Sequence, residues 1–87
     1  MLAHMGHIHP SKWDTATADT IRAERAAAQM SQAQLADKAG IPRTSYIRYE
    51  TGARVPNIAQ VAAIAEALDI RLTVFMRRVE DRVRTSL

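Results

Sequence analysis

Residues 30–40, near the middle of the chain, contain the clearest helix boundaries in the sequence. Ser31 is followed three residues later by Gln34, and this is the spacing of a capping box, in which two side chains bond to free backbone N–H groups. Gly40 then provides a residue that readily adopts the left-handed conformation in which helices often end. The sequence therefore predicts a short helix that begins after Ser31 and ends at Gly40.

The next segment, residues 43–50, follows a turn and divides into two faces. Pro42 pushes the residue before it out of the helical conformation, which forces a sharp bend in the chain. On a helix with about 100° per residue, Tyr46 and Tyr49 lie on one side. The opposite side carries Arg43, Thr44, Ile47 and Arg48. We expect the aromatic face to pack on a core and the other face to contact an ordered anionic partner.

Two further helices are expected, over residues 14–29 and 56–68. The first is rich in alanine, and Asp14 or Thr15 can cap it. Asn57 can cap the second, with a glutamine three residues later to complete a capping box. The buried side of the second helix is predicted to consist of Ile58, Val61, Ile64, Ala65 and Leu68.

The segment that follows, residues 70–87, fits two structures. As a strand, it alternates apolar and other residues, with Ile70, Leu72, Val74 and Met76 on one side. As a helix, it has an apolar stripe formed by Leu72, Phe75, Met76, Val79 and Val83. We favour a strand over residues 70–77, because the segment is rich in β-forming residues. A lone strand has unpaired edges, so we expect it to pair with its twin in a second subunit.

The composition fits one small domain without disulfides. The chain has 87 residues, 47% of them hydrophobic, and no cysteine. No apolar run approaches the ~18 residues that a membrane helix requires, and no secretion leader is recognisable, so we expect a cytoplasmic protein with no membrane segment. Since so small a core is marginal alone, dimerisation would add buried area.

The positive charge of the chain is concentrated around its middle. The formal net charge is +3, and residues 31–54 contain four basic side chains against two acidic ones. A local basic patch of this kind attracts the phosphate backbone of a nucleic acid.

Residues 1–13 show no periodicity, and we expect a flexible tail. His4, His7 and His9 are spaced so that they could hold a divalent metal. No carboxylate or cysteine completes such a site, so a disordered leader is the favoured interpretation and no metal site is predicted. Trp13 is interpreted as a packing anchor for the tail.

The segment SQAQLADKAGIPRTSYIRYETG resembles the signature of the phage-repressor and Cro-like helix-turn-helix family. The Ser-Gln and Leu-Ala pairs, the turn glycine and the Glu-x-Gly after the second helix stand at the family's spacing, and the resemblance covers about residues 18–69. It implies a mainly α, lambda repressor-like bundle of about four helices, which forms a DNA-binding domain over 14–69. A short C-terminal β-strand or a fifth helix, within 70–87, would serve dimerisation.

The resemblance also implies which residues contact DNA. The helix over 43–50 would lie in the major groove, while the helix over 31–39 would cross the backbone. The positions that read bases would be those of Arg43, Thr44, Ile47 and Arg48, and the positions that contact phosphates would be those of Gln32, Ser45 and Arg54. Arginine can bond both N7 and O6 of guanine, and an isoleucine can contact a thymine methyl group. Two alternatives stay open: Ile47 rims the core, and the arginines form only a solvated face.

Arg25 lies in the apolar stripe of the first helix, where a charge is unexpected. In the family, an arginine on this helix is often paired with the glutamate that ends the reading helix, here Glu50. The resemblance therefore implies a partly buried ion pair between Arg25 and Glu50, with a structural role.

The function predicted from these residues is that of a sequence-specific regulator of transcription. It would bind double-stranded DNA as a homodimer on a palindromic operator, in the role of a repressor, without a cofactor. The dimer contacts are expected to come from Leu72, Val74, Phe75 and Met76. The alternative is the antitoxin of a toxin–antitoxin pair, which would regulate its own operon and bind a toxin protein, because some family members carry a strand after the fourth helix. No catalytic constellation is recognisable, so an enzyme is not expected.

Overall fold

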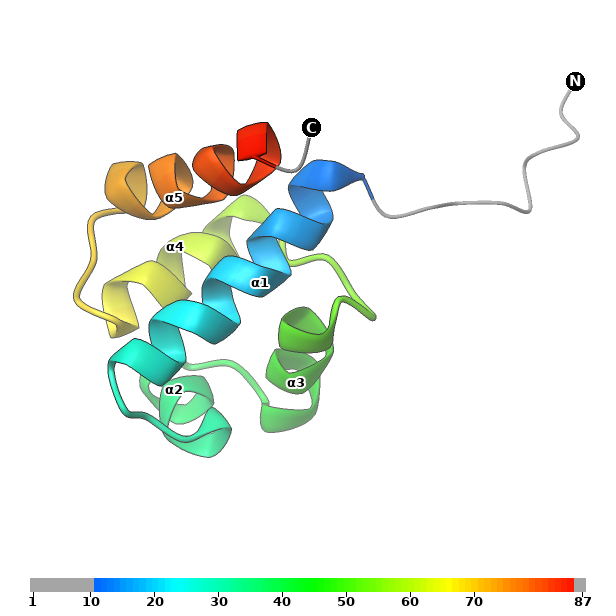
Figure 1. Ribbon diagram of the computed structural model, residues 1–87. Coiled ribbons are helices and arrows are strands. Elements are labelled where there is room, and N and C mark those ends of the chain that lie inside the picture. Colours follow the sequence, from blue (N-terminus) through cyan, green and yellow to red (C-terminus); the bar gives the residue numbers. More distant parts are fainter. Residues whose placement is uncertain (1–10, 86–87) are drawn as a thin grey trace, which may run out of the picture.

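The part of the chain that the structure describes folds into five α-helices (Figure 1). The structure is a computed structural model that describes residues 11–85. The helices are α1 (Lys12–Ala27), α2 (Gln32–Ala39), α3 (Arg43–Thr51), α4 (Ile58–Ala67) and α5 (Leu72–Thr85). The described part of the chain contains no β-strand, so the predicted mainly α fold is confirmed.

The helices contact one another in a continuous circuit. α1 packs against α3 and α5, α2 packs against α3 and α4, and α4 packs against α5. In the ribbon view, α2 and α3 lie together at the lower end of the molecule, and α5 lies along its upper edge (Figure 1). The two short helices are therefore separated from α5 by α1 and α4.

Helix α1 begins earlier than the sequence suggested. We expected Asp14 or Thr15 to cap it, but the cap is Ser11, whose hydroxyl oxygen accepts a hydrogen bond from the N–H of Asp14 at 3.1 Å. The Asp14 carboxylate in turn accepts from the N–H of Ser11 at 3.4 Å. Asp14 is thus the third residue of a capping box, and Trp13 belongs to the first turn of the helix.

The other helix boundaries follow the predicted signals. Ser31 with Gln34 and Asn57 with Gln60 form complete capping boxes at the starts of α2 and α4. Gly40 ends α2 with a φ of +70°, in the left-handed region where a side chain would be strained. These local interactions fix the length of α2 and the turn that leads into α3.

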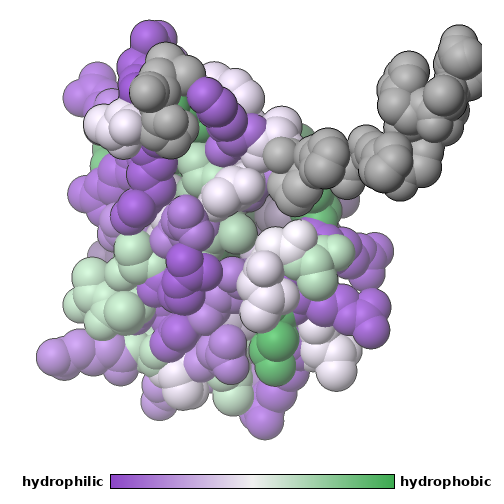
Figure 2. Space-filling view, turned by 45° about the vertical axis from the view of Figure 1, so that its right-hand side comes forward, coloured by the Kyte–Doolittle hydropathy of each residue, from purple (hydrophilic) through white to green (hydrophobic). Residues whose placement is uncertain are grey.

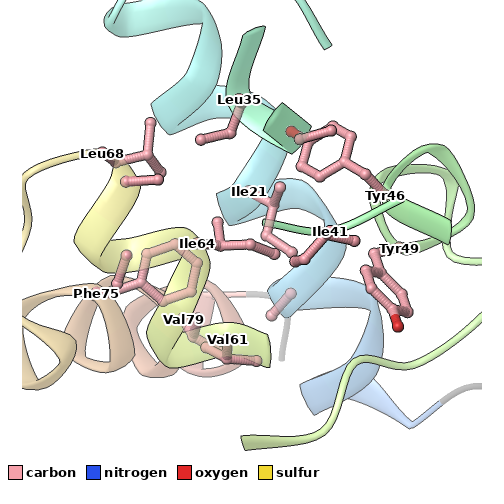
Figure 3. Close-up of a cluster of buried hydrophobic side chains, with 14 residues drawn as sticks. Ile21, Leu35, Ile41, Tyr46, Tyr49, Val61, Ile64, Leu68, Phe75 and Val79 are labelled. Atoms are coloured by element: carbon pink, nitrogen blue, oxygen red, sulfur yellow. The ribbon is translucent and has the colours of Figure 1, made fainter. Parts of the chain in front are cut away.

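The core lies between α1, α4 and α5 and extends to the inner sides of α2 and α3 (Figure 3). Its largest fully buried side chains include Tyr46, Tyr49 and Phe75. The predicted buried side of α4 is present except for Ile58, which is 65% exposed. Ile58 is the first residue of α4.

Of the two structures considered for residues 70–77, the favoured strand does not form. Leu72 to Thr85 form α5, in which Phe75 and Val79 are fully buried. The side chains of Leu72, Met76 and Val83 are partly buried against the same core. A helix satisfies its backbone hydrogen bonds internally, whereas a lone strand leaves them unpaired. In the helical form, the apolar stripe of this segment therefore packs on the core beside α1 and α4.

The helical form of this segment corrects one of the expected dimer contacts. Phe75 is inaccessible to solvent in the single chain, so its side chain cannot also contact a second subunit at the surface. Val74 is 38% exposed, and Leu72 and Met76 are partly exposed. An ion pair of 2.6 Å between Arg78 and Glu24 further holds α5 to α1.

The replacement Phe75→Ala should strongly destabilise the protein, because it removes the side chain by which α5 fills the core. We expect a loss of about 3–5 kcal/mol in the free energy of unfolding, measured by chemical denaturation. Val74→Ala, one residue away on the exposed side, should change it by less than about 1 kcal/mol. Equal effects of the two replacements would show that α5 does not pack as described.

Candidate nucleic-acid interface

The face of α3 that points away from the core carries all four predicted base-reading residues. Arg43, Thr44 and Arg48 are exposed, and Ile47 is 41% exposed. The space-filling view turns the side of the molecule that carries α3 toward the viewer (Figure 2). On this side, hydrophilic side chains dominate and hydrophobic ones form only small separate areas. The structure thus presents these residues to solvent as one polar face with an isoleucine within it.

The opposite face of α3 determines this orientation. Tyr46 is completely buried and Tyr49 is 1% exposed, and both rings point into the core (Figure 3). Burying two tyrosines removes several hundred Å² of largely apolar surface from water, and a rotation of α3 about its axis would expose them. The aromatic side therefore faces inward, and the arginine side faces outward.

Arg43 is held by a carboxylate from the other side of the turn. Its Nε donates to Asp37 Oδ1 at 3.2 Å, and its Nη2 donates to Asp37 Oδ2 at 2.8 Å. The Arg43 guanidinium, as a hydrogen-bond donor, lowers the pKa of the Asp37 carboxyl group below its usual range. Both side chains are more than half exposed, and ion pairs of this kind contribute only about 0–1 kcal/mol to stability. This contact was not predicted, because no spacing rule relates residues across a turn.

The remaining two arginines of the region have different surroundings. Arg54, in the loop after α3, lies with its guanidinium carbon 6.0 Å from the centre of the Tyr49 ring, at the limit of a cation–π contact. Within residues 11–85, neither Arg48 nor Arg54 forms an ion pair. Both guanidinium groups can therefore bind an anion without first losing a carboxylate partner.

Behind the exposed face, the carboxylate of Glu50 is the centre of a buried hydrogen-bond network. Glu50 is 2% exposed. Arg25 donates to both of its oxygens, with Nε–Oε2 and Nη2–Oε1 distances of 2.8 Å each. The hydroxyl of Tyr46 donates to Oε2 at 2.5 Å, and the amide of Gln32 donates to Oε1 at 3.1 Å. The predicted partners Arg25 and Glu50 are thus joined by two hydrogen bonds.

Two backbone carbonyl groups extend the network. Arg25 Nη1 donates to the carbonyl of Met30 at 2.8 Å, and Arg22 Nη1 donates to the carbonyl of Glu50 at 3.1 Å. The bond from Arg25 joins α1 to the chain just before α2, and the bond from Arg22 joins α1 to the end of α3. The network therefore fixes the positions of α2 and α3 relative to α1. The roles of Tyr46 and Arg22 were not predicted, because helix periodicity shows the face of a side chain and not its polar partner.

The charge of Glu50 is set by two opposing effects. Burial raises the pKa of its carboxyl group, but hydrogen bonds from Arg25, Tyr46 and Gln32 outweigh burial and hold the pKa below its ordinary value of 4.5. Burial and the bond to Glu50 both raise the pKa of the Tyr46 hydroxyl, which therefore stays protonated and continues to donate. At neutral pH, Glu50 is consequently an ionised acceptor surrounded by donors.

The predicted phosphate-contacting residues lie near the start of α2 and around α3. Gln32 is the first residue of α2, and one N–H of its side-chain amide is used by Glu50. Ser45 is half-buried on α3, and Arg54 is exposed. The structure therefore places Gln32 between the buried network and the protein surface, where its backbone N–H lies among the free N–H groups of a helix start.

Comparison with known proteins identifies this arrangement. A family model described as helix-turn-helix matches residues 21–75, which span α2, the turn, α3 and α4. The chain belongs to the helix-turn-helix family. The predicted resemblance to phage-repressor and Cro-like proteins is confirmed, and the helix-turn-helix unit itself is α2, the turn at residues 40–42 and α3.

A relative from Vibrio cholerae serotype O1 (strain ATCC 39315 / El Tor Inaba N16961) is similar over part of the chain. It is the cryptic phage CTXphi transcriptional repressor RstR, and it is 43% identical over 49 residues. These residues make up 56% of this chain and 44% of the relative. The similarity thus spans less than half the length of the relative.

A metal site and a membrane helix each require features that the described residues do not provide. No group of three or more histidine, cysteine or acidic side chains between residues 11 and 85 could hold a metal ion. The same part of the chain has no helix of the length and apolar character needed to cross a membrane. The three histidines, considered above as metal ligands, lie outside the described residues.

Single replacements of Arg25 or Glu50 by alanine should each lower the free energy of unfolding by about 3–5 kcal/mol, because each leaves a charged group in the interior without its partner. The double replacement Arg25→Met/Glu50→Leu should cost less than the sum of the two single losses, because it leaves neither charge behind. Thermal or chemical denaturation gives all three values. Unchanged melting points for both alanine variants would refute the importance of the pair.

The Glu50 carboxylate should also make the stability of the protein depend on pH. Its pKa is lower in the folded than in the unfolded chain, so its contribution is present above the unfolded value and is lost as the pH falls through the folded value. From about pH 6 to pH 3, the wild-type protein should therefore lose more stability than Glu50→Gln.

Denaturation series at fixed ionic strength measure this difference. Glu66→Gln, at an exposed site on α4, is the matched control and should keep the wild-type pH dependence. If Glu50→Gln lost stability as steeply as the wild type, another group would be responsible.

Proposed function

We propose that this protein is a regulator of transcription that binds double-stranded DNA sequence-specifically and acts as a repressor. The observation that carries the proposal is the exposed face of α3, with its two arginines, in a chain of the helix-turn-helix family. The similarity of part of the chain to a phage transcriptional repressor supports the same function. The local surplus of positive charge over residues 31–54 favours an anionic partner.

In the proposed complex, α3 lies in the major groove. Arg43 and Arg48 each bond the N7 and O6 atoms of a guanine, and Thr44 bonds a base edge or contacts a thymine methyl group. Ile47 lies between these polar residues and contacts a thymine methyl group. Its exposure of 41% favours this role over packing at the rim of the core.

Phosphate contacts around α3 would position the helix without reading sequence. Gln32 and the free backbone N–H groups at the start of α2 bind one phosphate, since the positive end of a helix attracts anions. Arg54 and Ser45 provide contacts on either side of the groove. Arg54 is well suited because it is exposed and has no carboxylate partner among the described residues.

We propose further that the protein acts as a homodimer on a palindromic operator. α3 has nine residues, so one copy covers only a few base pairs, whereas two copies related by a twofold axis read half-sites about one helical turn apart. Val74, with the exposed parts of Leu72 and Met76, offers an apolar surface on α5 for the contact between subunits. The antitoxin alternative relied on a strand in this segment, and with a helix there no observation favours it over a repressor.

Selection of bound duplexes from a random pool tests the proposal. We expect a palindromic consensus with at least one guanine in each half-site, and the spacing of the half-sites will report the geometry of the dimer. Enrichment of no sequence, with equal binding to all duplexes, would contradict sequence-specific binding.

Replacing Arg43 or Arg48 by alanine should reduce the preference for the guanine that each arginine reads by about 5- to 150-fold, because a bidentate contact is lost. Binding to random duplexes should fall much less. Competition titrations of the selected operator against single-base variants measure both effects. Arg77→Ala is the control, since it removes an exposed guanidinium on α5, away from α3 (Figure 1). Equal losses on operator and random DNA would mean that the two arginines contact only phosphates.

A further inference from the structure

The turn between α2 and α3 does not depend on the ion pair between Asp37 and Arg43. The pair joins the last turn of α2 to the first residue of α3, but the turn between them is already fixed by the left-handed Gly40 and by Pro42. With 62% of the Arg43 side chain and 59% of the Asp37 side chain exposed, the pair adds little to stability. Its effect must therefore be sought in what Arg43 binds.

The geometry of the pair leaves the DNA-reading edge of Arg43 free. A guanidinium group has five N–H donors in a planar fork. Asp37 accepts from Nε and from one N–H of Nη2, on one side of the fork. The two N–H groups of Nη1 and the second N–H of Nη2 are not used by Asp37. Of these three, the second N–H of Nη2 and one N–H of Nη1 lie parallel on the outer edge and match N7 and O6 of guanine.

We propose that Asp37 is a specificity-determining residue that positions Arg43 to read guanine. This inference rests on the proposed function of α3. The carboxylate limits the guanidinium to one orientation before DNA arrives, so less side-chain freedom is lost on binding. It also places a negative charge next to the interface, where it repels phosphates and weakens binding to non-specific DNA. Both effects increase the preference for the correct operator.

The position of Arg43 on α3 makes such support necessary. Arg43 is the first residue of the helix, where the positive end of the helix dipole disfavours a cation. Pro42 precedes it as the cap and makes no side-chain hydrogen bond that could hold the helix start. Asp37 supplies the negative charge that this end of α3 lacks, and the same contact orients Arg43.

The opposite role is the competing explanation. If Asp37 only occupied Arg43, the pair would have to break before DNA binds, and removal of the carboxylate would strengthen binding to every duplex without loss of selectivity. The two explanations thus predict different changes in selectivity for the same replacement, Asp37→Asn.

The experiment measures dissociation constants of the wild-type chain and of Asp37→Asn at one salt concentration. The duplexes are the selected operator, the operator with the guanine read by Arg43 replaced, and a random sequence. For Asp37→Asn we expect tighter binding to random DNA and a loss of about 2- to 5-fold in the preference for that guanine, since an exposed ion pair can orient Arg43 no more strongly than this. The preference for the other operator bases should stay unchanged, which a general loss of structure would not produce.

Two matched variants make the result specific. Asp81→Asn causes the same change of charge at an exposed site on α5, and it should not alter the preference for the guanine. In an Arg43→Ala background, Asp37→Asn should cause no further loss of that preference, since the carboxylate acts through Arg43. Thermal melts should show that Asp37→Asn folds as the wild type does.

Several results would overturn the inference. Tighter binding of Asp37→Asn to all duplexes, with the guanine preference intact, would identify Asp37 as a competitor. An equal loss of preference with Asp81→Asn, or a further loss in the Arg43→Ala background, would exclude an action through Arg43. If the wild-type chain bound operator and random DNA equally, the proposed function itself would fail, and the inference with it.

Discussion

The buried carboxylate of Glu50 is the interaction on which the arrangement of this helix-turn-helix protein depends. A charge that is 2% exposed is tolerated only if its acceptor sites are filled, and the donors come from three different helices. Arg25 belongs to α1, Gln32 to α2 and Tyr46 to α3. Because the donors must converge on one carboxylate, the three helices have little freedom to move relative to one another.

This constraint explains how α3 presents its outer face. The side chains that satisfy Glu50 or fill the core occupy the inner side of the helix, so the arginines and Ile47 lie on the side that faces solvent. The packing of the inner face thus determines which face of α3 points outward. Where an exposed residue also needs a fixed orientation, as Arg43 does, the protein uses a second contact, from Asp37.

Sequence patterns predicted those features that depend on neighbours in the chain. The capping boxes of α2 and α4 and the left-handed Gly40 follow from interactions within a few residues, and helical periodicity places the two tyrosines on one face. The cap of α1 was predicted wrongly, because Asp14 can serve either as a cap or as the third residue of a capping box. In the structure Ser11 is the cap, so Asp14 takes the second role. The pairing of Arg25 with Glu50 was inferred from the family resemblance and not from spacing.

The sequence by itself therefore determined the helix-turn-helix unit, because its helix starts, its turn and its two-faced helix are encoded by local chemistry. Only the tertiary structure decided the form of α5. Its apolar residues fit both a period of two and a period near 3.6, and the surface beside α1 and α4 selected the helix by burying Phe75 and Val79. The contact of Asp37 with Arg43 was likewise decided by the fold, since the angle of the turn, and no sequence spacing, brings the two side chains together.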